Sequence, residues 1–216
     1  LSLVSESNVK GKGDLAHLFV KEKPLLGKVE RNHAIDSKYK NREMKYSIYL
    51  PEGYDGVKEF PVLWLIHGYG DDQNSWLDKG YLHRFVHQYA SEGGREMIIV
   101  TPDGLTDFYM GAYENYFFKE LMPEVESKFK VKKGREYRTV AGLSMGGFHS
   151  LHISKQYPDM FNYVGLFSAA IWPNKNATSP IYQNAEEKLA TQFAKKPALY
   201  WIAIGKTDFL YKANTE

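Results

Sequence analysis

Five continuous apolar runs, most of them closed by glycine, constrain the fold of this chain more than any other feature. The runs are PVLWLIHG (61–68), MIIVTPDG (97–104), YRTVAGLS (137–144), YVGLFSAA (163–170) and ALYWIAIG (198–205). They are too continuous for strands that expose one face to water. Short apolar runs between turn residues are typical of strands buried on both faces of a parallel sheet.

Amphipathic segments separate these runs and predict helices. They cover residues 80–93, 115–129, 145–158 and 184–196. Ahead of them, MKYSIYL (44–50) alternates as a half-exposed strand does, and PEGYDG closes it with turn chemistry. This order predicts an α/β fold, a doubly wound and mostly parallel sheet with antiparallel strands at its start.

The length of 216 residues suits a single domain with a large core, since 43% of the residues are hydrophobic. The first 27 residues are polar with two glycines near their middle, and they predict a tail or a linker. We therefore expect the folded domain to span residues 28–216.

Composition excludes several classes of partner and site. The net charge is only +2 and no basic stripe stands out, so we expect no nucleic-acid partner. The absence of cysteine excludes disulfides, thiolate metal sites and a cysteine nucleophile.

No apolar run reaches the roughly 20 residues that span a bilayer, and the chain shows no signal peptide. His83 and His87 form an i, i+4 pair without a third ligand, so we expect no metal there. Oligomeric state is not indicated.

GLSMGG (142–147) lies between a predicted strand and a predicted helix. Gly-x-Ser-x-Gly in that setting is the nucleophile elbow, whose tight turn needs small residues on both sides of the serine. The turn presents the serine hydroxyl at the N-terminus of the next helix, where the backbone N–H of Met145 can stabilise an oxyanion. The motif predicts Ser144 as a nucleophile.

The loop HGYG (67–70) follows the first buried run. When an elbow is present, the second oxyanion donor comes from this loop, and Tyr69 is the candidate. His67 is therefore expected on the oxyanion side and not as the general base.

Asp208 follows the fifth apolar run and lies after the elbow in the chain. A triad acid orients and charge-stabilises the histidine, and in this fold the chain order is Ser, then Asp or Glu, then His. The order predicts Asp208 as the acid of a triad.

The motifs together resemble the esterase branch of the α/β-hydrolase superfamily, most closely carbohydrate esterase family 1. The segments that carry the resemblance are IHGYGDDQNSW (66–76), VTPDG (100–104), ENYFFKELMPEVE (114–126), AGLSMGGFHS (141–150) and IAIGKTDF (202–209). The branch includes feruloyl and acetyl xylan esterases, enterochelin esterases, S-formylglutathione hydrolase and mycolyltransferases.

The resemblance implies a serine carboxylesterase without a cofactor, acting on feruloyl or acetyl esters of plant polysaccharide outside the cytoplasm. Ser144 matches the family nucleophile and Asp208 its acid, while Tyr69 and Met145 match the oxyanion donors. Trp76 and Trp172 fall where family members line the substrate cleft, and core packing is an equal alternative for each.

The sequence departs from the family in its histidine, which normally follows the acid after one more helix and strand. All seven histidines of the chain precede Asp208. We therefore expect the catalytic histidine beyond residue 216 and the domain to be C-terminally incomplete, so that this polypeptide by itself is poorly active. Other esterases of the branch, or an inactive binding module on the same scaffold, remain as alternatives.

Overall fold

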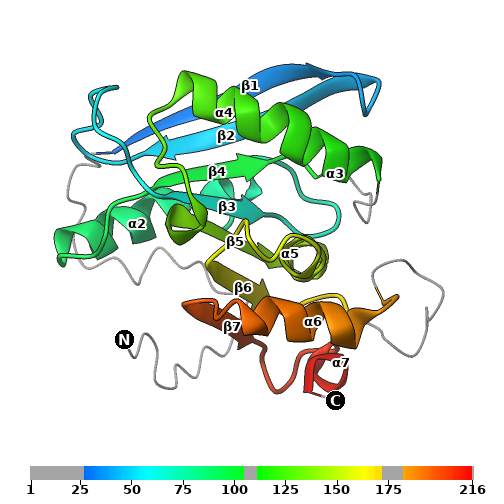
Figure 1. Cartoon of the computed structure of the whole chain (residues 1–216). Coiled ribbons are helices and arrows are strands. Elements are labelled where there is room, and N and C mark those ends of the chain that lie inside the picture. The colour runs from blue at the N-terminus through cyan, green and yellow to red at the C-terminus, as the bar shows by residue number, and fades with distance from the viewer. Residues whose placement is uncertain (1–26, 105–110, 172–181, 216) are drawn as a thin grey trace.

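The structure, a computed structural model, describes residues 27–104, 111–171 and 182–215. Seven strands form one sheet in the order β1-β2-β4-β3-β5-β6-β7 (Figure 1). Their bounds are β1 Lys28–Ser37, β2 Arg42–Leu50, β3 Val62–Ile66, β4 Ile98–Pro102, β5 Arg138–Leu143, β6 Tyr163–Phe167 and β7 Leu199–Ala203. Each of the five apolar runs contains one strand of the sheet.

The first two strands are antiparallel, and the rest of the sheet is parallel. β1 pairs with β2, and β2 pairs with β4, both in antiparallel register. The pairs β3–β4, β3–β5, β5–β6 and β6–β7 are all parallel. The predicted α/β architecture with antiparallel strands at its start is confirmed, and parallel pairing places the carboxyl ends of five strands at one edge.

Helices cover both faces of the sheet. Their bounds are α1 Ser75–Asp78, α2 Leu82–Ser91, α3 Ala112–Tyr116, α4 Met122–Lys128, α5 Met145–Gln156, α6 Ala185–Ala194 and α7 Tyr211–Thr215. On one face, α3, α4 and α5 bury the main core around Trp64, Phe117 and Val140. On the other, Leu82 and Val86 of α2 pack against Leu65 and Ile99. Within the described residues, no helix is both long and apolar enough to cross a membrane.

The helix predicted over 115–129 forms with a widened turn in its middle. Phe117–Leu121 is a π-helical segment, η2, between α3 and α4. Met122 donates its N–H to the carbonyl of Phe117, five residues back, and Pro123 follows with no N–H to donate. Because proline interrupts the regular ladder, the segment departs from α geometry where the pattern predicted an unbroken helix.

Candidate active site

Ser144 occupies a sharp turn between β5 and α5, at the carboxyl edge of the sheet. Its backbone has φ 55° and ψ −110°, a conformation that costs a non-glycine residue about 1–3 kcal/mol. Hydrogen bonds hold it there: the Ser144 N–H donates to Phe167 O at 2.8 Å, and the Ser144 carbonyl accepts from Phe148 N at 3.0 Å. This is the strand–turn–helix geometry of a nucleophile elbow.

The glycines of GLSMGG are required by contacts that the structure makes explicit. A Cβ on Gly142 would lie 2.3 Å from the backbone of Gly146, and a Cβ on Gly146 would lie 2.3 Å from Ile66 O. On Gly147 it would lie 2.8 Å from the side chain of Ala169. The turn therefore packs directly against β3 and the loop after β6, with no space for a side chain.

Met145 begins α5, so no earlier helical turn accepts its N–H. Its N–H has no hydrogen-bond partner among the described residues. The Met145 side chain is fully buried in the main core. Only the backbone N–H of Met145, at the partially positive N-terminus of the helix, is therefore a candidate to take part in the site.

The loop after β3 brings Gly68 and Tyr69 to the elbow. A Cβ on Gly68 would lie 3.6 Å from Ser144 Cβ, so the two backbones are adjacent. The N–H of Asp71 donates to Gly68 O at 3.2 Å, and Gly70 has φ +79°, which indicates a type II turn with Tyr69 at its second position. Tyr69 is 65% exposed, and its N–H has no partner among the residues described.

A polar network, which sequence reasoning missed, fixes the rest of this loop against β1 and β4. The Asn32 side-chain oxygen accepts from Gln73 Nε2 at 2.7 Å and from Asn74 Nδ2 at 2.9 Å. Thr101 Oγ1 donates to Gln73 O at 2.8 Å. Asn32 has φ 59° where the β1–β2 register shifts, and that β-bulge turns its side chain toward the loop. No local pattern in the sequence marks the bulge.

His67 is buried beneath the same loop, and backbone groups hold both of its ring nitrogens. Nδ1 lies 2.7 Å from Gly68 O, and Nε2 lies 2.7 Å from the N–H of Gly104. A carbonyl only accepts and an N–H only donates, so the ring is neutral with its proton on Nδ1. Asp103 Oδ1 lies 3.6 Å from Nε2.

Asp208 lies in the turn after β7, two strands from the elbow. Its Oδ1 accepts from Leu210 N at 2.8 Å. Leu210 is buried in a small cluster with Phe148 and Ala170, both close in the fold to Ser144. The turn that carries Asp208 is thereby packed against the first turn of α5. Over the described ranges, no hydrogen bond joins Asp208 to a histidine.

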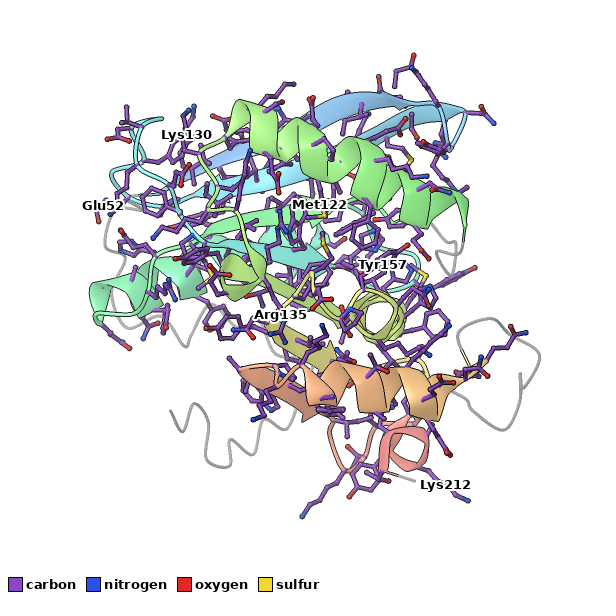
Figure 2. The ribbon with its side chains drawn as sticks, viewed as in Figure 1. Glu52, Met122, Lys130, Arg135, Tyr157 and Lys212 are labelled. Carbon is purple, nitrogen blue, oxygen red and sulfur yellow. The ribbon has the colours of Figure 1, made fainter. Side chains whose placement is uncertain are left out.

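The two histidines of α5 contact residues of α3. His149 is buried against the ring of Tyr113, and burial holds the pKa of His149 well below its usual value. His152 Nε2 lies 2.9 Å from Glu114 Oε2, and Tyr157, labelled in Figure 2, donates a short hydrogen bond to the same carboxylate. The hydrogen bond with His152 lowers the pKa of Glu114, although burial of the carboxylate acts to raise it. These groups join α5 to α3.

The two tryptophans predicted for the cleft differ in what the structure says of them. Trp76 in α1 is half-buried and packs against the cluster of Tyr49, Leu65 and Ile99 on the α2 face. Its place in a substrate cleft stays a prediction. Trp172 lies outside the described residues.

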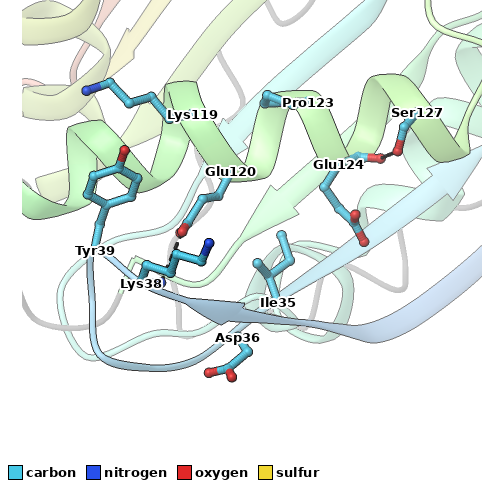
Figure 3. A pocket seen from close by; sticks show the side chains of 9 residues that line it. All are labelled: Ile35, Asp36, Lys38, Tyr39, Lys119, Glu120, Pro123, Glu124 and Ser127. Atoms are coloured by element: carbon cyan, nitrogen blue, oxygen red, sulfur yellow. Dashed lines mark hydrogen bonds between the residues drawn. The ribbon is translucent and has the colours of Figure 1, made fainter.

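A separate cavity of about 490 Å³ lies between the end of β1 and the helix formed by η2 and α4 (Figure 3). Tyr39 lies against Lys119 there, with 5.4 Å from Nζ to the ring centre. The Glu120 carboxylate accepts from Ser37 Oγ at 2.5 Å and Lys38 N at 3.0 Å. β1 is at the far end of the strand order from the elbow, so this cavity is distinct from it. In the described part of the chain, no group of three or more His, Cys, Asp or Glu side chains is arranged to hold a metal ion.

Fold and elbow together define a protein of the α/β-hydrolase class. A mostly parallel sheet carries a strained serine between strand β5 and the helix that follows. Residues 37–215 match the family described as "Putative esterase". The chain belongs to this esterase family.

Individual relatives agree with the family. The chain is 32% identical over 149 residues, 62% of its length, to an endo-1,4-beta-xylanase/feruloyl esterase of Xylanibacter ruminicola. It is 24% identical over 185 residues to endo-1,4-beta-xylanase Y of Acetivibrio thermocellus. The chain spans only 20% and 17% of the lengths of these two relatives.

Solved structures show the same fold. A ferulic acid esterase superposes with a TM-score of 0.74 at 26% identity, covering 88% of this chain and 83% of its own. A feruloyl esterase module from Clostridium thermocellum, a mutant complexed with sinapinate, superposes with a TM-score of 0.73 at 23% identity. That match covers 89% of this chain and 71% of the module.

Proposed function

We propose that this domain is the esterase part of a plant-polysaccharide-degrading enzyme, and that it cleaves feruloyl or acetyl esters through an acyl-enzyme on Ser144. The observation that supports the proposal is the strained backbone of Ser144 at the start of α5, with the loop of Gly68 packed against it. Backbone strain of this kind persists where the surrounding structure imposes it, and it clusters at functional sites.

In the proposed reaction, Ser144 Oγ attacks the ester carbonyl while a histidine takes its proton. The N–H groups of Tyr69 and Met145 stabilise the oxyanion, and the histidine returns the proton to the leaving alcohol. Water then attacks the acyl-enzyme by the same steps and releases the acid. Asp208 orients the histidine and stabilises its charged form.

The general base in this proposal is a histidine outside the described residues. His67 has both ring nitrogens bound to the backbone, and the α5 histidines contact Tyr113 and Glu114. The sequence order Ser, Asp, His places the base after Asp208. We therefore propose that the catalytic histidine follows Glu216, within a domain that begins near residue 28.

The names of the relatives support the substrate class. Two of them are xylanases, one also a feruloyl esterase, and the structural neighbours include a complex with sinapinate, an aromatic acid. Another relative, at 28% identity, is an acetyl esterase of Caldicellulosiruptor saccharolyticus. Polysaccharide of the plant cell wall lies outside the cell that degrades it, so we further propose that the enzyme is exported.

Two measurements on the full-length protein test this function. A fluorophosphonate probe should label Ser144, and Ser144→Ala should abolish labelling. The rate of methyl ferulate hydrolysis is then compared with the rate of acetate release from acetylated xylan. The comparison shows which of the two acyl groups the enzyme prefers. If the wild-type protein is labelled no more than Ser144→Ala, the domain is a binding module on a hydrolase scaffold.

A further inference from the structure

His67 is buried, and backbone groups hydrogen-bond to both nitrogens of its neutral ring. Its Nδ1–H donates to Gly68 O at 2.7 Å, which is the carbonyl of the Gly68–Tyr69 peptide. Its Nε2 accepts the Gly104 N–H at 2.7 Å, from the loop that follows β4. The ring therefore connects the loops at the carboxyl ends of two neighbouring strands, β3 and β4.

The orientation of the Gly68–Tyr69 peptide follows from these bonds. A trans peptide is planar, and its C=O and N–H point in opposite directions. The described chain contains no cis peptide. His67 Nδ1 and the Asp71 N–H both donate to Gly68 O, so they fix the plane of the peptide and direct the Tyr69 N–H away from themselves.

We propose that His67 is a positioning residue that fixes the oxyanion hole, and that its Nδ1–H bond to Gly68 O keeps the Tyr69 N–H directed at the oxyanion. This inference rests on the proposed function, because it needs the Tyr69 N–H to be an oxyanion donor. The Gly104 N–H has a supporting part: by binding Nε2 it holds the neutral tautomer whose proton lies on Nδ1. An oxyanion donor that is already oriented needs no reorganisation during the reaction. Loss of the His67 hydrogen bond should therefore lower kcat.

Substitution of His67 by asparagine or glutamine can keep one of the two hydrogen bonds of the ring and remove the other. In His67→Asn the Nδ2 group takes the place of Nδ1 and can donate to Gly68 O, but nothing accepts from Gly104. In His67→Gln the terminal amide takes the place of Nε2 and can accept from Gly104, but the donor to Gly68 is lost. His67→Ala removes both bonds.

We expect His67→Gln and His67→Ala to lower kcat for p-nitrophenyl acetate about 100-fold in the full-length protein, with KM changed less than about threefold. His67→Asn should retain kcat within about tenfold of wild type. Thermal unfolding is measured for all three variants. The proposal is overturned if kcat is unchanged in every variant, if the losses fall on KM, or if His67→Gln retains more kcat than His67→Asn.

A second pair of variants tests the oxyanion donor itself. Tyr69 occupies the second position of a type II turn, where proline is favoured, so Tyr69→Pro removes the N–H and retains the turn. Tyr69→Ala keeps the N–H and is the matched control. We expect Tyr69→Pro to lower kcat about 100-fold, and to lower it further than Tyr69→Ala does, because only the proline removes the N–H. If Tyr69→Pro is fully active, the oxyanion assignment of the proposed function fails. If Tyr69→Pro is impaired but the Asn and Gln variants of His67 behave alike, only the role of His67 fails.

Discussion

The carbonyl of Ser144 accepts a hydrogen bond from the N–H of Ala170 at 2.9 Å, which joins the serine turn to the loop that leaves β6. Ala170 packs with Phe148 and with Leu210, whose own N–H is bound by the Asp208 carboxylate. The turn that carries Ser144 and the turn that carries Asp208 are therefore supported by one small cluster. Two segments about sixty residues apart in sequence are thus positioned together.

Backbone strain at Ser144 predicts a difference in stability between two variants of this residue. Ser144→Gly removes the penalty of φ 55°, whereas Ser144→Ala keeps it. We expect Ser144→Gly to be more stable than Ser144→Ala by about 1 kcal/mol in urea unfolding. Equal unfolding free energies for the two variants would show that the turn carries no strain.

The close approach of Gly146 to β3 predicts severe destabilisation when a methyl group is added. In Gly146→Ala the new Cβ would meet Ile66 O at 2.3 Å and His67 O at 2.7 Å, and backbone atoms of a central strand cannot yield easily. We expect a loss of about 3 kcal/mol or more. Gly205→Ala is the matched control, because nothing lies within 4 Å of its Cβ position. Similar unfolding midpoints for both variants would contradict the packing described for the elbow.

The Asn32 network predicts that a residue of β1 supports the loop carrying Tyr69. Asn32→Gly accommodates φ 59° but loses the bonds to Gln73 and Asn74, so we expect about 1–2 kcal/mol lower stability together with reduced kcat. Asn41→Gly, at φ 51° in the exposed turn between β1 and β2, is the control and should leave both unchanged. A loss of stability without any change in kcat would confine Asn32 to a purely structural role.

Burial of His149 predicts a loss of stability in mild acid. Its folded pKa lies well below its unfolded value of about 6.5, so below that pH the unfolded chain binds the extra proton. Stability should therefore be complete above about pH 6.5 and fall toward pH 5, with a slope approaching about 1.4 kcal/mol per pH unit. Glu114 does not contribute in this window, because its pKa is lowered from an already acidic value.

Unfolding curves measured from pH 7 to pH 5 check this slope. His149→Phe, which keeps an aromatic ring beside Tyr113, should flatten it. Burial also lowers the pKa of His83, which is less buried, so His83→Gln is the comparison and should flatten the slope less. A slope in His149→Phe as steep as in wild type would assign the pH dependence to other groups.

The sheet and the elbow are predictable from the sequence alone, because both follow from local chemistry. Continuous apolar runs such as 61–68 are typical of buried strands, and glycines around Ser144 mark a turn that no larger residue fits. Asp208 and the HGYG loop were predicted from their positions after strands, since parallel strands end at one edge.

The contacts that support these groups are visible only in the folded chain. The β-bulge that turns Asn32 toward Gln73, the bond from Gly104 to His67 and the cluster of Phe148, Ala170 and Leu210 all join residues distant in sequence. The packing of Trp76 against the α2 face belongs to the same group. Such contacts depend on register and on how loops pack against one another, and a local pattern of residues encodes neither.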